Sequence, residues 1–432
     1  MLLAAKIITT ATSSLQKTLV KDAMTTSLFK KRRSFLIRLA KTLHQCGTPA
    51  YQLEGHLVKI SEALELGGSF LISPTSITCV FWPKDDRENQ ENSYIARVQP
   101  GDLDLGLLAR TDELVEELCS GQRDLDDALI RLEEITHKPN PYPKGVILIA
   151  FGLASAAFSM LMGTSWVDVI ASFILGIGVY GLVLWGEKSP RIQTALEPLA
   201  AVAAAFGASA MAFVEPSINM ALVVLASIIV FIPGLALTVG LSELAARDLV
   251  SGTVRVMDAL MALFKLYFGA FLGFAIASVL FGNVPQQETV LLPKWTGWLA
   301  VLVLSFSLMV MFKIRLKDAP WGVAAGFLGH GVSLLASAFF GIALGTFFAA
   351  LFLGMYANLY ARWLKAPAAI VLLQGIVVLV PGSKLYMGLN TVISGKEILH
   401  IEQIGSQSFL ILMSLVAGLI FANIIVDPRR SL

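Results

Sequence analysis

The chain has 432 residues, of which 56% are hydrophobic and only 15% are charged, and its formal net charge is +2. Soluble domains carry about 25% charged residues, so this composition excludes an ordinary soluble protein and predicts a polytopic membrane protein in a lipid bilayer. The small net charge says little about partners, and no nucleic acid is expected among them. Three widely spaced cysteines precede the first long apolar segment, so neither disulfides nor a metal site is expected, and no cofactor either.

Residues 1–33 form a Ser/Thr-rich head that ends in the basic run 30–33. The apolar start, Leu2–Ala5, is too short for the core of a signal peptide. We therefore expect a loose basic segment near acidic lipid headgroups, with a processed targeting signal as the alternative.

Residues 34–143 predict a small cytosolic α+β domain. Apolar residues recur at helical spacing from Phe35 to Leu43, and Gly47 ends that run. The later elements of the domain are expected to be a helix over 50–66, a strand over 70–82 bent at Pro74, a strand over 94–98, and helices over 103–119 and 125–135. No catalytic constellation emerges, so a gate or a regulatory dock is expected rather than an enzyme.

From Gly145 the chain becomes apolar, and the hydropathy pattern predicts about ten transmembrane segments. We place them at 145–162, 166–185, 192–213, 217–249, 257–281, 297–313, 319–338, 341–361, 367–388 and 407–426. Shifting the first five segments along the chain until Pro233 falls on Pro381 places each on one of the second five. Five crossings are an odd number, so we expect two inverted five-helix repeats, over 144–282 and 297–432, joined by an outer loop over 283–296.

Two of these segments contain a Pro-Gly pair at matched positions, Pro233-Gly234 and Pro381-Gly382. Proline lacks an amide donor and clashes one turn back, so each pair is expected to break its helix. Residues 217–249 would also span about 50 Å as one straight helix, much more than a bilayer core of about 30 Å. Interrupted segments at corresponding positions of two halves indicate the substrate site of a transporter.

Positive residues predict that both termini are cytoplasmic, in a multi-pass protein of the cell inner membrane. With the first domain in the cytosol, the outer loops carry only Lys294, Lys384 and Lys396. The cytosolic connections then carry Lys138, Lys144, Lys188, Arg191, Arg247, Arg255, Lys313, Arg315, Lys317, Arg362, Lys365, Arg429 and Arg430.

Several stretches resemble the threonine/serine exporter family. Residues 35–81, 100–118 and 127–135 look like that family's amino-terminal domain, and PGLALTVGLSELAARDLVSGTVRVMDAL, residues 233–260, is similar to its most recognisable membrane motif. The later PGSKLYMGL matches the second membrane part. The resemblance implies export of threonine and serine driven by the proton gradient. Relatives in which the halves are separate proteins are associated with succinate, so a dicarboxylate is the alternative substrate.

The broken helices supply the first candidate site residues, Pro233, Gly234, Pro381 and Gly382. The amino-terminal end of a half-helix carries a partial positive charge that can hold the carboxylate of an amino acid or a dicarboxylate. Two inert kinks are the structural alternative. Further uncharged polar candidates in the second half are Asn358, Gln374, Ser383 and Asn390, each of which could bond to substrate or across helices.

Four ionisable residues are candidates for proton coupling or ion pairing. Glu243 could bind a substrate ammonium or carry a proton, or it could pair with Arg247 one turn on. Lys265 lies two turns after Asp258 on the same helix face, and snorkelling to the interface is its structural alternative. His330, between two glycines, could relay protons or only pack between helices.

The broken fourth and ninth segments predict a transporter with one midplane site, and the resemblance implies that it exports small hydrophilic amino acids. Rivals are a dicarboxylate exporter, a membrane-anchored hydrolase and a channel. The small-molecule substrate and the bilayer are the expected partners, and a homo-oligomer is left open.

Overall fold

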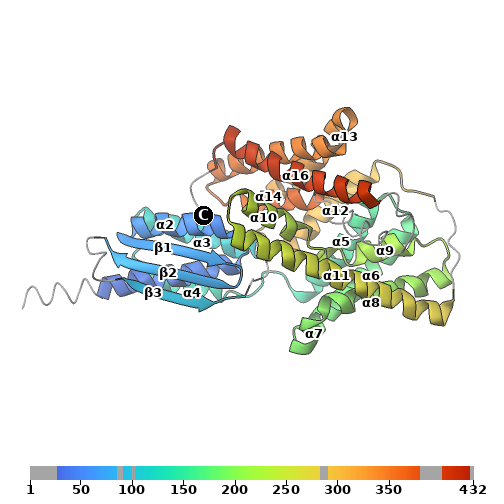
Figure 1. Cartoon of the computed structure of the whole chain (residues 1–432), viewed down its shortest axis with the longest axis horizontal. Coiled ribbons are helices and arrows are strands. Elements are labelled where there is room, and N and C mark those ends of the chain that lie inside the picture. The colour runs from blue at the N-terminus through green and yellow to red at the C-terminus, as the bar shows by residue number, and fades with distance from the viewer. Residues whose placement is uncertain are drawn as a thin grey trace, which may run out of the picture. The chain divides into compact units, whose positions relative to one another are not determined.

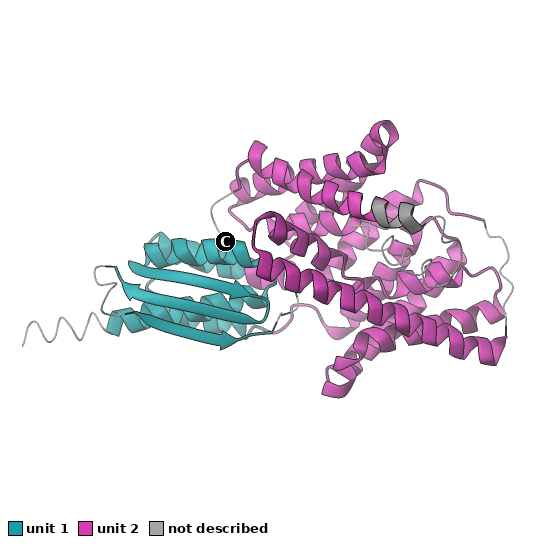
Figure 2. Ribbon diagram, viewed as in Figure 1, with its two compact units in different colours: residues 1–102, 110–138, 431–432 teal, residues 103–109, 139–430 magenta. Residues whose placement is uncertain are grey.

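The structure is a computed structural model that describes residues 27–84, 91–99, 101, 103–282, 290–379 and 401–428, the side chains of 401–406 excepted. The chain divides into two compact units (Figure 2). Unit 1 comprises residues 1–102, 110–138 and 431–432, and unit 2 comprises residues 103–109 and 139–430.

Unit 1 combines helices with one antiparallel sheet in the order β1-β2-β3 (Figure 1). The strands are β1 Leu66–Ser73, β2 Ser76–Pro83 and β3 Asn92–Arg97. The helices are a first helix over 27–45, α2 Ala50–Ala63, α3 Leu105–Cys119, of which residues 110–119 belong to this unit, and α4 Leu125–Thr136. The apolar residues of the first helix, from Phe35 to Leu43, were expected to form its buried face. Four of their large side chains are fully buried: Phe35, Leu36, Leu39 and Leu43.

The strand predicted over residues 70–82 is in fact two strands of a hairpin. Ser73 pairs with Ser76, so Pro74 lies in the two-residue connection instead of bending one strand. The first strand also begins earlier than expected, at Leu66, and includes Gly67 opposite Trp82. A Cβ at Gly67 would lie 2.0 Å from the Trp82 indole nitrogen, so glycine is needed here to admit the tryptophan ring.

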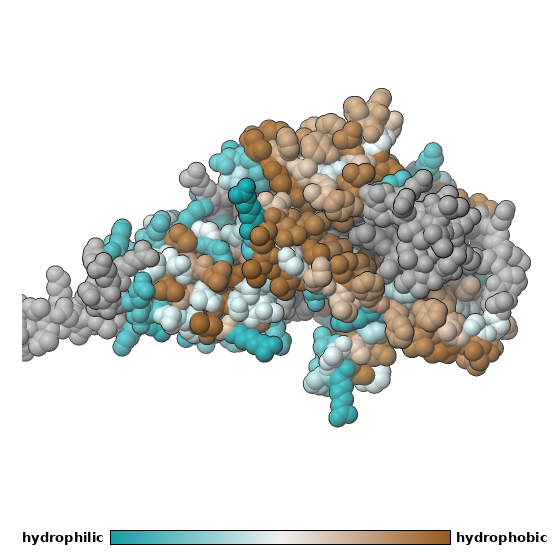
Figure 3. All heavy atoms as spheres, in the orientation of Figure 1, coloured by the Kyte–Doolittle hydropathy of each residue, from teal (hydrophilic) through white to brown (hydrophobic). Residues whose placement is uncertain are grey.

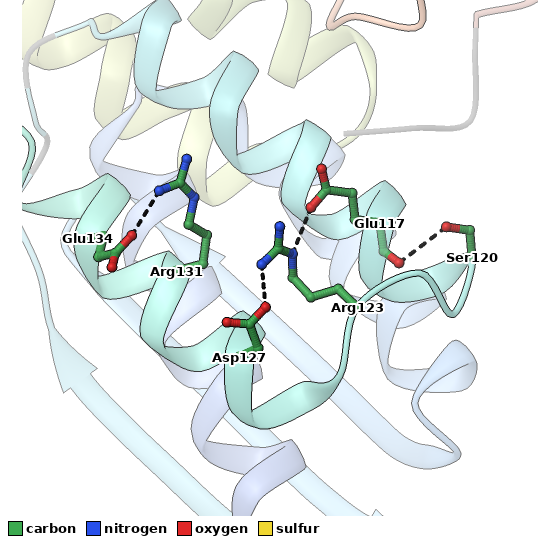
Figure 4. A network of polar contacts seen from close by, with 6 residues as sticks. All are labelled: Glu117, Ser120, Arg123, Asp127, Arg131 and Glu134. Carbon is green, nitrogen blue, oxygen red and sulfur yellow. Dashed lines mark hydrogen bonds and ion pairs between the residues drawn. The ribbon is translucent and has the colours of Figure 1, made fainter.

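Ion pairs hold the helices of unit 1 to one another at the surface. Lys31 and Arg38 on the first helix pair with Asp126 and Glu133 on α4. At the turn between α3 and α4, Arg123 donates to Glu117 and to Asp127, as Figure 4 shows. Exposed pairs contribute little individually, so the buried apolar residues stabilise this unit and the pairs align its helices.

Unit 2 is built from apolar helices, and apolar side chains cover much of the face seen in Figure 3. Its first half contains α5 Lys144–Leu161, α6 Trp166–Gly186, α7 Pro190–Thr194, α8 Leu196–Val214, α9 Met220–Ser227, the 3-10 turn η1 Ile229–Phe231, α10 Gly234–Ala245 and α11 Leu249–Phe281. Its second half contains α12 Thr296–Met311, α13 Ala319–Leu364, α14 Ala369–Leu379 and α16 Ile401–Ile425.

Six of the described helices are long and apolar enough to cross a bilayer, or seven if the bent pair of Met220–Ser227 with Ile229–Ala245 is one span. Two further apolar helices, α12 and α14, are shorter. The protein is therefore a polytopic membrane protein, as its composition predicted.

Two interruptions divide long apolar stretches in the described part of unit 2. The chain bends by 57° between α9 and the piece that contains η1 and α10, within the segment predicted to be broken. Helix α13, with 46 residues, would be about 69 Å long if it were straight. Gly341 within it is non-helical, with φ 81° and ψ 170°, and falls at the start of the predicted segment 341–361. Glycine adopts this positive φ without the strain that a side chain would bring.

The contact between α8 and α11 recurs between the end of α13 and α16 (Figure 1). A Cβ on Gly269 would meet the Pro198 carbonyl at 2.4 Å and the Ala201 methyl at 2.9 Å. A Cβ on Gly418 would meet the carbonyl of Phe347 at 2.5 Å and the methyl of Ala350 at 2.8 Å. Gly269, Pro198 and Ala201 precede Gly418, Phe347 and Ala350, respectively, by the same number of residues. The same close backbone approach is therefore made once in each half.

A second contact between the same pairs of helices also occurs in both halves, but the glycine is on the other helix of the pair. Gly273 of α11 faces the Ala205 methyl of α8, and a Cβ at Gly273 would lie 2.7 Å from it. The same offset in residue number leads to Gly354 of α13, which faces the Ala422 methyl of α16 at 2.6 Å from a built Cβ. Each contact therefore has room for one methyl group and not for two.

We expect Gly269→Ala and Gly418→Ala to destabilise the protein by about 1–3 kcal/mol each, because the added methyl group overpacks a backbone contact. Thermal unfolding of the purified full chain in detergent measures the effect. Gly178→Ala is the matched control, since nothing lies within 4 Å of a Cβ at Gly178 in α6. Equal unfolding temperatures for all three variants would contradict this account.

Unit 1 is expected to lose stability as the pH falls from about 6.5 toward 4, in part through His56. Burial, with the nearby Lys59 charge, lowers the pKa of His56 from 6.5 to about 4. The unfolded chain then binds the proton more readily than the folded one, and this favours unfolding at acidic pH. Hydrogen-exchange protection of α2 between pH 7 and pH 4.5 should therefore fall less steeply in His56→Gln. Identical pH profiles in the parent and the variant would refute the assignment.

Candidate functional site

The break predicted at Pro233 produces a half-helix that begins inside unit 2. Helix α9 ends at Ser227, a single 3-10 turn follows, and α10 starts at Gly234 with Pro233 at its N-cap. Pro233 at the N-cap makes no side-chain hydrogen bond to the first turn of α10. The first amides of a helix have no partner within it, so this end of α10 presents donors and a positive dipole end.

A tight turn connects α10 to α11. Arg247 adopts a left-handed conformation with φ 66°, its amide donates to the Leu244 carbonyl, and the Asp248 amide donates to the Glu243 carbonyl. The Asp248 carboxylate then accepts from the Ser251 amide and caps the start of α11. These bonds reverse the chain over a short turn, so α10 and α11 form a helical hairpin.

Two glycines bring the arms of this hairpin together. A Cβ on Gly252 would lie 2.8 Å from the Gly240 carbonyl, and one on Gly240 would lie 2.9 Å from the Val256 side chain. The helix backbones therefore touch at Gly240 and Gly252. The next turn on each arm carries Glu243 and Arg255.

Glu243 and Arg255 form a two-pronged ion pair between the arms. Arg255 Nε donates to Glu243 Oε2 at 3.0 Å, and Arg255 Nη2 donates to Glu243 Oε1 at 3.2 Å. The exposed fraction is 0% for the Glu243 side chain and 21% for that of Arg255. A buried carboxylate has to be paired to be tolerated, and Arg255 offers the planar fork that matches it.

This pairing replaces the local one considered from the sequence. Arg247, one turn after Glu243, is exposed in the turn. The sequence placed Arg255 in a cytosolic connection and gave no sign that it pairs with Glu243. Spacing along one helix could not reveal the pair, because the chain reverses between the two residues. The sequence did contain one signal for this reversal. Asp248, followed by Ser251 and Gly252, is a residue that can cap the start of a new helix.

Lys265 pairs with a residue of another helix. Its Nζ lies 3.6 Å from Glu197 Oε2 in the first turn of α8, and the two side chains are 41% and 31% exposed. Asp258, the candidate on the same face of α11, is exposed and makes no ion pair with a described residue.

His330 lies on α13 beside aromatic rings of the second half. Its ring meets Trp298 edge to face, with centroids 5.0 Å apart, and a Cβ on Gly297 would lie 3.5 Å from His330 Nε2. This environment holds the imidazole in place by packing. The ionisable candidates thus lie in separate surroundings. Glu243 pairs with Arg255 on the hairpin, Lys265 pairs with Glu197, and His330 packs against Trp298.

Helix α10 makes contacts with the second half of unit 2, against α14 and α16. Helix α14 is the first part of the second predicted broken segment, 367–388. Of that segment, Pro381, Gly382 and Ser383 lie outside the described residues, and so does the nearby Asn390. The described part already brings the two predicted broken segments into contact.

Among the described residues, no group of three His, Cys, Asp or Glu side chains lies close enough to hold a metal ion. In unit 1, Glu54 accepts from the Ile72 amide at 2.6 Å, and His44 Nε2 lies 3.1 Å from the Ser73 carbonyl. Both side chains thus bond to the β1 backbone, which is a structural role.

Comparison with protein families decides how the hairpin and its surroundings are interpreted. Residues 34–277 match a family model described as "Putative threonine/serine exporter", and residues 298–425 match a second model, "Threonine/Serine exporter, ThrE". The chain belongs to the threonine/serine exporter family. The two matches cover both units and both halves of the membrane part.

Fungal membrane proteins are among the relatives of this exporter-family chain. "Pheromone-regulated membrane protein 10" of Saccharomyces cerevisiae is 27% identical over 384 residues, covering 85% of this chain and 49% of the yeast protein. The Eremothecium gossypii protein of that name is 27% identical over 364 residues, covering 81% and 48%. The chain thus spans about half the length of these relatives. No solved structure matches it.

We expect Arg255→Met to destabilise the protein by about 3 kcal/mol, because it removes a charged partner that donates twice to the buried Glu243 carboxylate. This figure is at the low end for a buried pair, since Arg255 is 21% exposed. The double variant Glu243→Gln/Arg255→Met should recover much of the loss. Thermal unfolding of parent, single and double variants gives the coupling, and strictly additive effects would contradict a direct pair.

Proposed function

We propose that the protein is a secondary transporter that exports threonine and serine from the cytosol, driven by the proton gradient. The observation that carries the proposal is the half-helix α10, which starts at Pro233-Gly234 and carries the fully buried Glu243. A helix end and a paired charge inside an apolar unit are typical of a substrate site in a transporter. Family membership supports the choice of amino acids.

The first turn of α10 suits the carboxylate of an amino acid. The N-cap Pro233 does not cap the amides of this turn with a side chain, and a carboxylate at this end interacts favourably with the helix dipole. Gly234 is buried, so a ligand bound there would be shielded from bulk water. A second half-helix end, which the sequence predicts at Pro381-Gly382, would complete the site with Ser383 and Asn390.

Ten crossings in two inverted repeats remain part of the proposal. Its support is the constant shift along the chain that relates the contacts of α8 with α11 to those of α13 with α16. The non-helical Gly341 within α13 and the bend after α9 are further support. In this arrangement both termini and unit 1 would be cytoplasmic at the inner membrane, with unit 1 as a gate or dock.

For proton coupling, we propose that Glu243 is the central group. Protonation of a buried carboxylate would weaken its pair with Arg255 and free the guanidinium. Because α10 contacts α14 and α16, a movement of the hairpin would alter the packing of these helices of the second half. Lys265 with Glu197, Asp258 and His330 are the further candidates for coupling.

The dicarboxylate exporter is the alternative, and a specific observation keeps it open. Lys265 and Arg255 are both cations of α11, and a dicarboxylate would need such groups. A membrane-anchored hydrolase is less well supported, because His44 and Glu54 of unit 1 bond to the backbone of that unit.

Proteoliposomes preloaded with labelled threonine, serine or succinate should release threonine and serine, and faster with a proton gradient than without one. Glu243→Gln should reduce this gradient dependence about tenfold or more, because the carboxylate proposed to carry the proton is replaced by an amide. Lys144→Met is the control, since Lys144 forms an exposed pair with Glu187 at 2.7 Å.

Lys265→Met separates the two substrate classes in the same assay. Succinate release that is lost in Lys265→Met, without threonine release, would replace the proposal by the dicarboxylate alternative. Absence of release for all three compounds would contradict the proposed export and favour an activity in unit 1.

A further inference from the structure

Among the buried side chains of the membrane part with an unpartnered polar atom, Gln374 is the one whose amide oxygen and amide nitrogen both lack a hydrogen-bond partner among the described residues. Gln374 lies on α14 with an exposed fraction of 1%. A primary amide offers two donors and an acceptor, and leaving them unpaired in an apolar interior is strongly unfavourable.

The surroundings of Gln374 are shaped to admit this amide. Helix α14 lies between the two arms of α13, since a Cβ on Gly375 would lie 2.4 Å from Leu353 Cδ1. A Cβ on Gly322, in the other arm, would lie 1.6 Å from Gln374 Oε1. Any side chain at position 322 would therefore displace the amide, and the glycine keeps its place open.

Packing by itself does not require an amide at this position. The two halves can be aligned in two ways that differ by one residue. Aligning Pro233 with Pro381 places Gln374 opposite Ala226 of α9, and aligning Gly269 with Gly418 places it opposite Leu225. Both residues are apolar and fully buried. Where the first half has a hydrocarbon side chain, the second half has an unpaired amide, so the difference between the halves is chemical.

We propose that the Gln374 amide is a substrate-binding group that selects a small hydroxylated amino acid in its zwitterionic form. The Nε2 hydrogens can donate to a carboxylate or a hydroxyl oxygen, and Oε1 can accept from an ammonium or a hydroxyl group. A dicarboxylate could use only the donors and would bring its anionic oxygens near Oε1. This inference rests on the proposed export of threonine and serine and identifies a residue that sets its specificity.

The position of α14 fits this role. It opens the second predicted broken segment, and it contacts α10, whose first turn is the proposed carboxylate site. A ligand held between the two broken segments would therefore reach groups from both halves.

Thermal unfolding of the purified full chain, with and without L-threonine, L-serine or succinate, tests the proposal. Gln374→Leu should unfold at the same temperature as the parent or higher without ligand, because the unpaired amide is removed. Its stabilisation by threonine and serine should be lost, with affinity weaker by about ten- to hundredfold for one or two missing hydrogen bonds.

Asn358→Leu is the matched control, because it removes a buried amide that is paired. Asn358 Nδ2 donates to Asn423 Oδ1 at 2.9 Å and to the Val426 carbonyl at 2.7 Å. This variant should unfold at a lower temperature than the parent and should still be stabilised by threonine.

Three results would overturn the proposal. Threonine stabilisation of Gln374→Leu equal to that of the parent would exclude a binding role and leave the proposed export standing. A loss of stability in Gln374→Leu as large as in Asn358→Leu would show that the amide supports the fold. A parent stabilised by none of the compounds, or by succinate alone, would overturn both this inference and the proposed substrate.

Discussion

A backbone amide or carbonyl within a bilayer has no water to bond, so every departure from helical geometry must be enclosed or satisfied by protein. Unit 2 departs at the end of α9, at the turn after α10 and at Gly341. The segment around η1 packs against α5. The turn after α10 satisfies its own backbone through the bonds of Arg247 and Asp248. Two of these irregular points flank the half-helix α10.

The same constraint applies to charge. Glu243 has no exposed surface, and Arg255 reaches it from the opposite arm with two donors. One turn away, Gly240 and Gly252 let the two arms touch, and this close approach brings the two side chains together. The residues that make the membrane motif recognisable therefore act together: two glycines set the distance, Asp248 starts the second helix, and the ion pair closes the hairpin.

Some of this organisation could be predicted from the sequence because its causes are local. Pro233-Gly234 breaks a helix by its own chemistry, and the apolar spacing from Phe35 to Leu43 marks a buried face. The hairpin at Pro74 was missed, because a Pro-Thr connection between two β-rich runs also fits a bent single strand.

The ion pairs could not be predicted for another reason. Glu243 with Arg255, and Lys265 with Glu197, join different helices, and helical spacing reports only neighbours within one helix. The unpaired state of Gln374 is likewise a property of the assembled helices. Its residue type was a visible candidate, but only packing shows that no described partner reaches it.

The two glycine–alanine contacts have a consequence for how the family varies. At Gly273 with Ala205 the glycine lies on the later helix, and at Gly354 with Ala422 it lies on the earlier one. The fold thus fixes the combined volume of the two side chains and leaves open which helix carries the methyl group. Across related sequences, such positions should change in concert, with a gain at one member of the pair matched by a loss at the other.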